Sequence, residues 1–144
     1  MSYTGLILDD AKSALQPYID RLNKAYEFDI YFCGLLREAI DTLNSDKGAA
    51  LNFLIIDAAL ACETFYTTEE TNHGKFTGLC LIKDIRNGKF IVNKNVPIVI
   101  FSNHRNDPEI IRFAERNTPC IVVNKLPFIK DFAKTLRDFI EEKK

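Results

Sequence analysis

The stretch Phe53-Leu54-Ile55-Ile56-Asp57 decides the fold, because four large apolar residues run directly into one carboxylate. A short run that is apolar at every position is typical of a strand buried on both faces of a parallel sheet. Three other segments share this form and also end in polar residues, at 6–10, 98–102 and 121–125. Parallel strands present their carboxyl ends along one edge of a sheet, so these terminal side chains are expected to share a crevice.

Helical periodicity between the apolar segments completes an alternating pattern. Strands are expected at 3–8, 28–32, 51–56, 96–101 and 120–123. Helices are expected at 11–26, 35–43, 77–90, 108–116 and 127–142. Thr77 is the expected N-cap of the third helix, and Asp107 caps the fourth with Pro108 at its first position. The pattern predicts an α/β fold with helices on both faces of a five-stranded parallel sheet.

A polar stretch at 62–75 has no clear period and is expected to be a long loop. It contains Phe65 and Tyr66, which either fold back onto the domain or contact a partner, and His73, which is expected to be solvated. The sequence leaves the two alternatives for the aromatic residues open.

Composition limits the function classes. The 144 residues fit one domain spanning 1–144, and the net charge of −1 gives no electrostatic signature for nucleic acid or an acidic membrane. Four cysteines are scattered without a C-x-x-C pair, and two of them, Cys80 and Cys120, are expected to be core thiols. No leader or membrane span is evident in the sequence. The expected location is the cytoplasm.

The polar residues at the expected strand ends have complementary chemistry. Asp9, Asp10 and Asp57 would lie close together, and such a cluster of like charges requires a cation. Magnesium fits because it prefers hard oxygen ligands and keeps waters for a substrate. An aspartate can attack phosphorus, while Ser102 and Lys125 supply donors for the transferred group. The set indicates phosphoryl transfer onto an aspartate.

The order of these residues resembles the receiver domain of two-component response regulators. That family has an acidic pair after strand one, a phosphorylated aspartate after strand three, Ser or Thr after strand four and Lys after strand five. The matching residues are Asp9-Asp10, Asp57, Ser102 and Lys125. The resemblance covers the whole chain, and it implies the doubly wound, flavodoxin-like sheet of order 2-1-3-4-5.

The resemblance also implies a role for each metal ligand. Asp57 would be the phosphoacceptor and a ligand of Mg²⁺. Asp10 would bind the ion directly and Asp9 mainly through water, while the carbonyl of Ala59 would complete the protein ligands.

Four further residues would contact or border the phosphoryl group. By resemblance, Ser102 would donate a hydrogen bond to it and Lys125 would pair with it. His104 would modulate dephosphorylation, unless it is a solvated loop residue, and Asn103 stands where the family usually has a small residue. The implied phosphodonor is a histidine kinase or a histidine phosphotransfer protein. Output would pass through protein contact or a phosphorelay, with a homodimer as an open option and no direct nucleic acid or membrane partner.

Other interpretations remain. Asp9 and Asp10 could simply cap the following helix, because Asp is a favoured N-cap. Ala61, Asn103 and Val122 replace the proline, small residue and aromatic residue that receivers usually carry, which favours a pseudo-receiver that acts only as an interaction module. A haloacid-dehalogenase-like phosphohydrolase is disfavoured, because no second aspartate stands two positions after Asp57 or Asp9.

Overall fold

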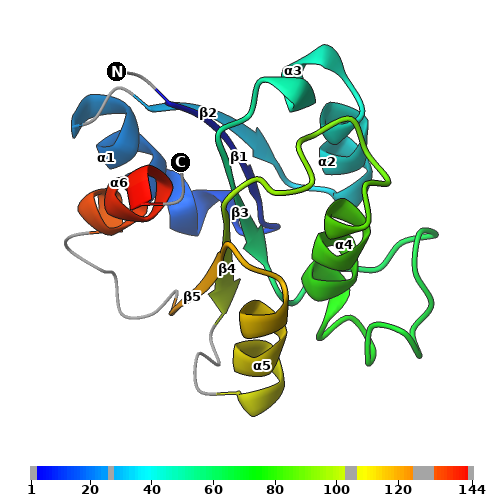
Figure 1. The fold of residues 1–144 in the computed structure, drawn as a ribbon. Helices are drawn as coiled ribbons and strands as arrows, with labels where there is room; N and C mark the ends of the chain where they lie inside the picture. The colour runs from blue at the N-terminus through cyan, green and yellow to red at the C-terminus, as the bar shows by residue number, and fades with distance from the viewer. Residues whose placement is uncertain (1–2, 26–27, 103–106, 125–131, 143–144) are drawn as a thin grey trace.

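The computed structural model describes residues 3–25, 28–102, 107–124 and 132–142. Within these ranges, strands and helices alternate along the chain, apart from two consecutive helices after the second strand (Figure 1). The strands are β1 (Tyr3–Leu8), β2 (Phe28–Cys33), β3 (Phe53–Asp57), β4 (Ile98–Ser102) and β5 (Cys120–Asn124). The helices are α1 (Lys12–Ala25), α2 (Leu36–Leu43), α3 (Asp46–Ala49), α4 (Thr77–Arg86), α5 (Pro108–Arg116) and α6 (Phe132–Glu142). No helix in these ranges has the length and apolar character needed to cross a membrane.

The strands of the described chain form one all-parallel sheet in the order β2-β1-β3-β4-β5. The predicted fold class and strand order are therefore confirmed. The register pairs Leu8 with Ile56 and Asp57 with Phe101, so β1, β3 and β4 end at nearly the same level. The residues that follow or end these strands are thereby brought to one edge of the sheet.

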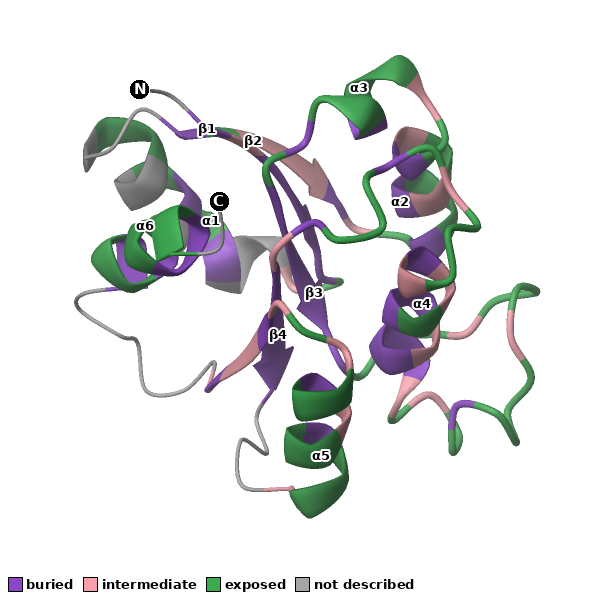
Figure 2. Ribbon diagram, in the orientation of Figure 1, coloured by how far each residue is buried: buried purple, intermediate pink, exposed green. Residues whose placement is uncertain are grey.

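Alternating side chains of the strands build two apolar layers. Leu54 and Ile56 of β3 face the layer covered by α2, α4 and α5, whereas Ile55 faces the layer covered by α1 and α6. Figure 2 shows the central strands buried, with α1 and α6 on one side and α2 to α5 on the other. Each large side chain buried in this way contributes about 1.5–3 kcal/mol of transfer free energy. The continuous apolar runs of the sequence follow from this two-sided burial.

Three local expectations were wrong. Thr77 is the first residue of α4 rather than its N-cap, because its hydroxyl donates to the carbonyl of Leu60 at 2.7 Å instead of accepting from the helix. The residues Asn44-Ser45-Asp46-Lys47-Gly48 predict a turn that closes the second helix, but a short helix, α3, begins within them. Cys80 is only partly buried, because its position on α4 lies at the margin of the apolar layer, whereas Cys120 is buried as expected.

The connection from β3 to α4 closes on itself in the way of an Ω-loop. At its neck, the Leu60 amide donates to the Gly74 carbonyl at 3.1 Å and the Gly78 amide donates to the Ala58 carbonyl at 3.0 Å. Gly74 has a φ of 88°, a left-handed conformation that glycine adopts without steric strain. We call residues 61–73, which leave and rejoin the fold at this neck, the insertion loop.

Side chains of the insertion loop attach it to the helices on either side. The hydroxyl of Tyr66 donates to Oδ2 of Asp84 on α4 at 2.7 Å, and Glu63 accepts from the amide of Arg37 on α2 at 3.3 Å. Burial, and next the hydrogen bond to Asp84, raise the pKa of Tyr66, so its phenol remains a donor. Tyr66 thus folds back onto the domain, while Phe65 is exposed. His73 is exposed, as expected.

Candidate functional site

Three carboxylates meet at the carboxyl edge of the sheet. Asp9 and Asp10 follow β1 and Asp57 ends β3, and each offers one carboxylate oxygen within 4.8 Å of the others. Asp9 is fully buried and Asp57 is 5% exposed, whereas Asp10 is exposed. Asp9 also accepts from the amide of Ala11 at 2.8 Å through Oδ1. This bond forms a turn just before α1, which begins at Lys12, so it is not itself an N-cap bond of the helix and it is compatible with the metal interpretation.

Backbone contacts hold Asp57 in place. Oδ1 of Asp57 accepts from the amide of Ala59 at 3.1 Å, and the Ala58 amide donates to the carbonyl of Phe101 at 3.0 Å on the neighbouring strand. Gly78 packs directly on the carbonyl group of Asp57 from the start of α4. The backbone at Asp57 is thus held between β4 and α4, while the Ala59 amide orients the carboxylate.

Ser102 ends β4 beside Asp57 and is 3% exposed. It lies in register with Asn124 at the end of β5, so these two strand ends are level. Ser102 is therefore brought to the same edge as the three carboxylates. The other residues expected at the site, Asn103, His104 and Lys125, lie outside the described residues.

The donor set of the cluster suits a divalent cation. All its side-chain ligands are carboxylate oxygens, which Mg²⁺ prefers, and two of the three residues are buried. Three carboxylates this close together repel one another unless a cation or a proton compensates their charge. The residues present therefore fit Mg²⁺, with Ala59 placed two residues after Asp57 to offer its carbonyl.

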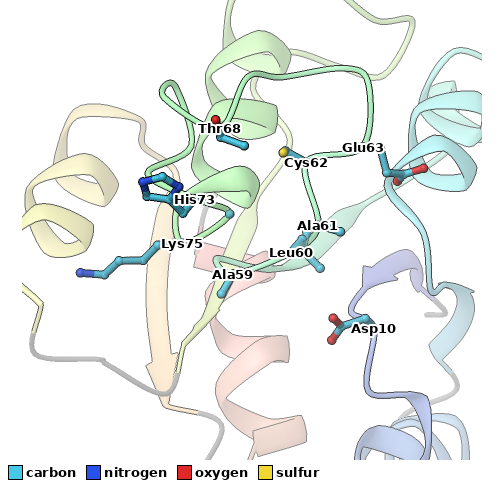
Figure 3. A pocket seen from close by; sticks show the side chains of 10 residues that line it. Asp10, Ala59, Leu60, Ala61, Cys62, Glu63, Thr68, His73 and Lys75 are labelled. Atoms are coloured by element: carbon cyan, nitrogen blue, oxygen red, sulfur yellow. The ribbon is translucent and has the colours of Figure 1, made fainter.

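A cavity of about 690 Å³ adjoins the carboxylate cluster at Asp10 (Figure 3). Asp10 and Ala59 belong to its wall on the side of the site, while Glu63, Thr68 and Lys75 line it from the insertion loop and the neck. The cavity therefore adjoins the carboxylate site through Asp10 and Ala59. The insertion loop borders the site on this side.

One ion pair beside the site had no signal in the sequence. Nζ of Lys75 lies 3.3 Å from Oδ2 of Asp107, although the two residues are far apart in the chain. Oδ1 of Asp107 accepts from the Glu109 amide at 2.9 Å and caps α5, which confirms the predicted N-cap. The hydrogen bond from Glu109, and further the contact with Lys75, lower the pKa of Asp107. Asp107 is therefore ionised and linked to both groups.

Comparisons with known proteins agree with this architecture. No family model matches the chain, and no curated protein matches its sequence. Among solved structures, the receiver domain of the Francisella response regulator 1452 is 17% identical with a TM-score of 0.72, and the match covers 99% of both chains. The Vibrio cholerae chemotaxis protein CheY4 is 18% identical with a TM-score of 0.68 over 100% of both chains.

A third similar structure extends this likeness. A response regulator receiver domain protein from Clostridium thermocellum is 14% identical with a TM-score of 0.71, covering 98% of this chain and 96% of that one. At identities this low the likeness concerns the fold, and it extends over essentially the whole chain. The chain therefore has the fold of response regulator receiver domains.

Proposed function

We propose that this protein is a receiver that accepts a phosphoryl group from a phosphohistidine donor onto Asp57 with Mg²⁺. The observation that carries the proposal is the meeting of Asp9, Asp10 and Asp57 within 4.8 Å at the carboxyl edge of a receiver-type sheet. Ser102 at the end of the neighbouring strand adds a hydroxyl at the same edge. A turn before α1 would explain the contact of Asp9 with Ala11, but it would not explain a buried carboxylate at Asp57.

In the proposed transfer, a carboxylate oxygen of Asp57 forms a bond to phosphorus as the donor's phosphorus–nitrogen bond breaks. The leaving imidazole nitrogen keeps the electron pair of the broken bond. The Ala59 amide keeps Asp57 oriented through its hydrogen bond to Oδ1. Asp10 and Asp9 would hold the metal with Asp57 and the carbonyl of Ala59, and the bound metal supplies positive charge for the phosphoryl oxygens.

The remaining site roles are part of the same proposal. Ser102 would donate a hydrogen bond to the phosphoryl group and Lys125 would pair with it, while Asn103 and His104 would modulate its hydrolysis. The partners proposed are a histidine kinase or histidine phosphotransfer protein and a downstream protein target. A new dianion at Asp57 would bias the segment after β4, and the target would recognise this change. The proposed location is the cytoplasm.

Incubation with Mg²⁺ and acetyl phosphate is expected to add one phosphate to the protein, measured as intact mass. The Asp57→Asn variant should gain none, because an amide cannot act as the acceptor. Asp29→Asn is the matched control, since Asp29 is an exposed carboxylate near the opposite end of the sheet. Absence of a mass gain in the unmodified protein, or an unchanged gain in Asp57→Asn, would contradict the proposal.

Magnesium is expected to raise the melting temperature of the protein, and the Asp10→Asn variant should lose most of this rise. In EDTA the same variant should melt a few degrees higher than the unmodified protein, because one of three mutually repelling carboxylates is gone. Thermal unfolding with and without Mg²⁺ measures both effects, and Asp29→Asn should change neither. If Mg²⁺ leaves the melting temperature of the unmodified protein unchanged, the protein would instead be a pseudo-receiver. Ala61 and Val122 favour that alternative, and the side chain of Val122 packs at the margin of the core.

A further inference from the structure

Lys75 lies where the insertion loop rejoins the fold, beside the backbone that follows Asp57. Its neighbour Gly74 is hydrogen-bonded to Leu60 across the neck, and Lys75 lines the same cavity as Ala59 and Asp10 (Figure 3). The amide of Ala59 in turn donates to Oδ1 of Asp57. The Lys75 side chain therefore starts next to the segment that orients the proposed acceptor.

The ammonium group of Lys75 is engaged by the helix after β4. It lies 3.3 Å from Oδ2 of Asp107, with the lysine side chain 47% exposed and the aspartate 15% exposed. In Figure 3 the Lys75 side chain extends away from Asp10. The other oxygen of Asp107 caps α5 through the Glu109 amide. One carboxylate thus joins the neck of the insertion loop to the first turn of α5.

We propose that Lys75 is a second cation for the phosphoryl group and that it leaves Asp107 when Asp57 is phosphorylated. This inference rests on the function proposed above. A phosphorylated side chain carries up to two negative charges, and the Asp107 carboxylate carries one, so the new group competes strongly for one ammonium. Lysine suits such a change of partner because its stem is flexible and its three donors rotate freely. Its exposure and the adjoining cavity leave room for the movement.

The competition has a consequence at α5. When Lys75 turns to the phosphoryl group, Asp107 loses its ion pair but keeps its cap hydrogen bond. Phosphorylation would thereby change the charge balance at the start of the helix that follows β4. Conversely, the affinity of Asp107 for Lys75 opposes phosphoryl binding, because one ammonium cannot pair fully with both groups.

Beryllofluoride with Mg²⁺ is a suitable probe, since it mimics a phosphoryl group at an aspartate without requiring a donor. Binding to the full chain is measured by isothermal titration calorimetry. Lys75→Met is expected to weaken binding roughly fivefold, because a charge-assisted contact is lost. Asp107→Asn is expected to tighten binding roughly threefold, because Lys75 is released while asparagine still caps α5.

The opposite signs separate this role from a purely structural one. The double variant Lys75→Met/Asp107→Asn should bind like Lys75→Met alone, because Asp107 acts only through Lys75. Lys89→Met is the matched control. Lys89 follows the end of α4 that lies away from the site, and its ammonium lies 3.5 Å from Oδ2 of Asp84 within the helix. It should bind as the unmodified protein does.

Three outcomes would overturn the inference. If the unmodified protein binds beryllofluoride and neither single variant changes the affinity, Lys75 is not a phosphoryl ligand. If both variants weaken binding equally, the Lys75–Asp107 pair is only structural. If the unmodified protein binds no beryllofluoride and accepts no phosphate, the proposed function fails and this inference fails with it.

Discussion

Replacing Gly78 with alanine is expected to abolish phosphorylation of Asp57 and to lower the free energy of unfolding by about 3 kcal/mol. A Cβ at Gly78 would overlap the carbonyl oxygen of Asp57, and this oxygen belongs to backbone that cannot turn aside as a flexible side chain would. The Gly78 amide also donates to the Ala58 carbonyl at 3.0 Å, so α4 cannot retreat without losing that bond. Either adjustment moves the acceptor carboxylate.

Thermal unfolding and the mass gain with acetyl phosphate measure the two effects of Gly78→Ala. The matched control is Gly34→Ala, because the nearest atoms to a Cβ there are Phe32 Cε1 at 3.8 Å and the Asp9 carbonyl oxygen at 4.0 Å. Gly34 lies near the same edge of the sheet, yet its replacement meets only ordinary van der Waals distances. A Gly78→Ala protein that is phosphorylated at the normal rate would contradict the prediction.

Replacing Arg86 with methionine is expected to lower the free energy of unfolding by about 3 kcal/mol, or the melting temperature by roughly 10 °C. At the end of α4 its guanidinium donates to four carbonyls at 2.8–2.9 Å, those of Lys94, Val96, Asn117 and Pro119. Burial lowers the pKa of Arg86, but an arginine stays charged. Methionine fills similar space and leaves these carbonyls without their donor.

Two variants sharpen the Arg86 prediction. Arg86→Lys should recover only part of the loss, because an ammonium is a point charge and cannot reach four carbonyls spread around a planar guanidinium. Arg112→Met, on the exposed face of α5, is the control and should unfold as the unmodified protein does. Equal stability of the Arg86→Met and Arg112→Met proteins would show that these hydrogen bonds contribute nothing net.

The sheet could be predicted from sequence because its signal is local. In β3, every residue of Phe53–Asp57 is buried, so its first four residues are apolar and Asp57 is the one carboxylate. The parallel arrangement then places Asp9, Asp10 and Asp57 at one edge without further information. The structure brings these three together, and their chemical roles remain a proposal.

Contacts made by the tertiary arrangement could not be predicted in the same way. Thr77 has the residue type of an N-cap, yet its hydroxyl donates a hydrogen bond to the nearby carbonyl of Leu60. The hydrogen bonds of Arg86 with Asn117 and Pro119 form only because α4 lies beside the turn before β5. The pairing of Lys75 with Asp107 depends on how the insertion loop rejoins the fold, which backbone hydrogen bonds decide.

The hydrogen-bonded neck also lets the insertion loop vary independently of the sheet. Because Leu60 and Gly74 already meet, the entropy of closing the loop depends only weakly on its length, and doubling that length costs about 0.6 kcal/mol. Residues 61–73 can therefore lengthen, shorten or change composition while the sheet and its carboxylates stay as they are. The surroundings of the site can thus diversify over evolution with little penalty to the fold that carries it.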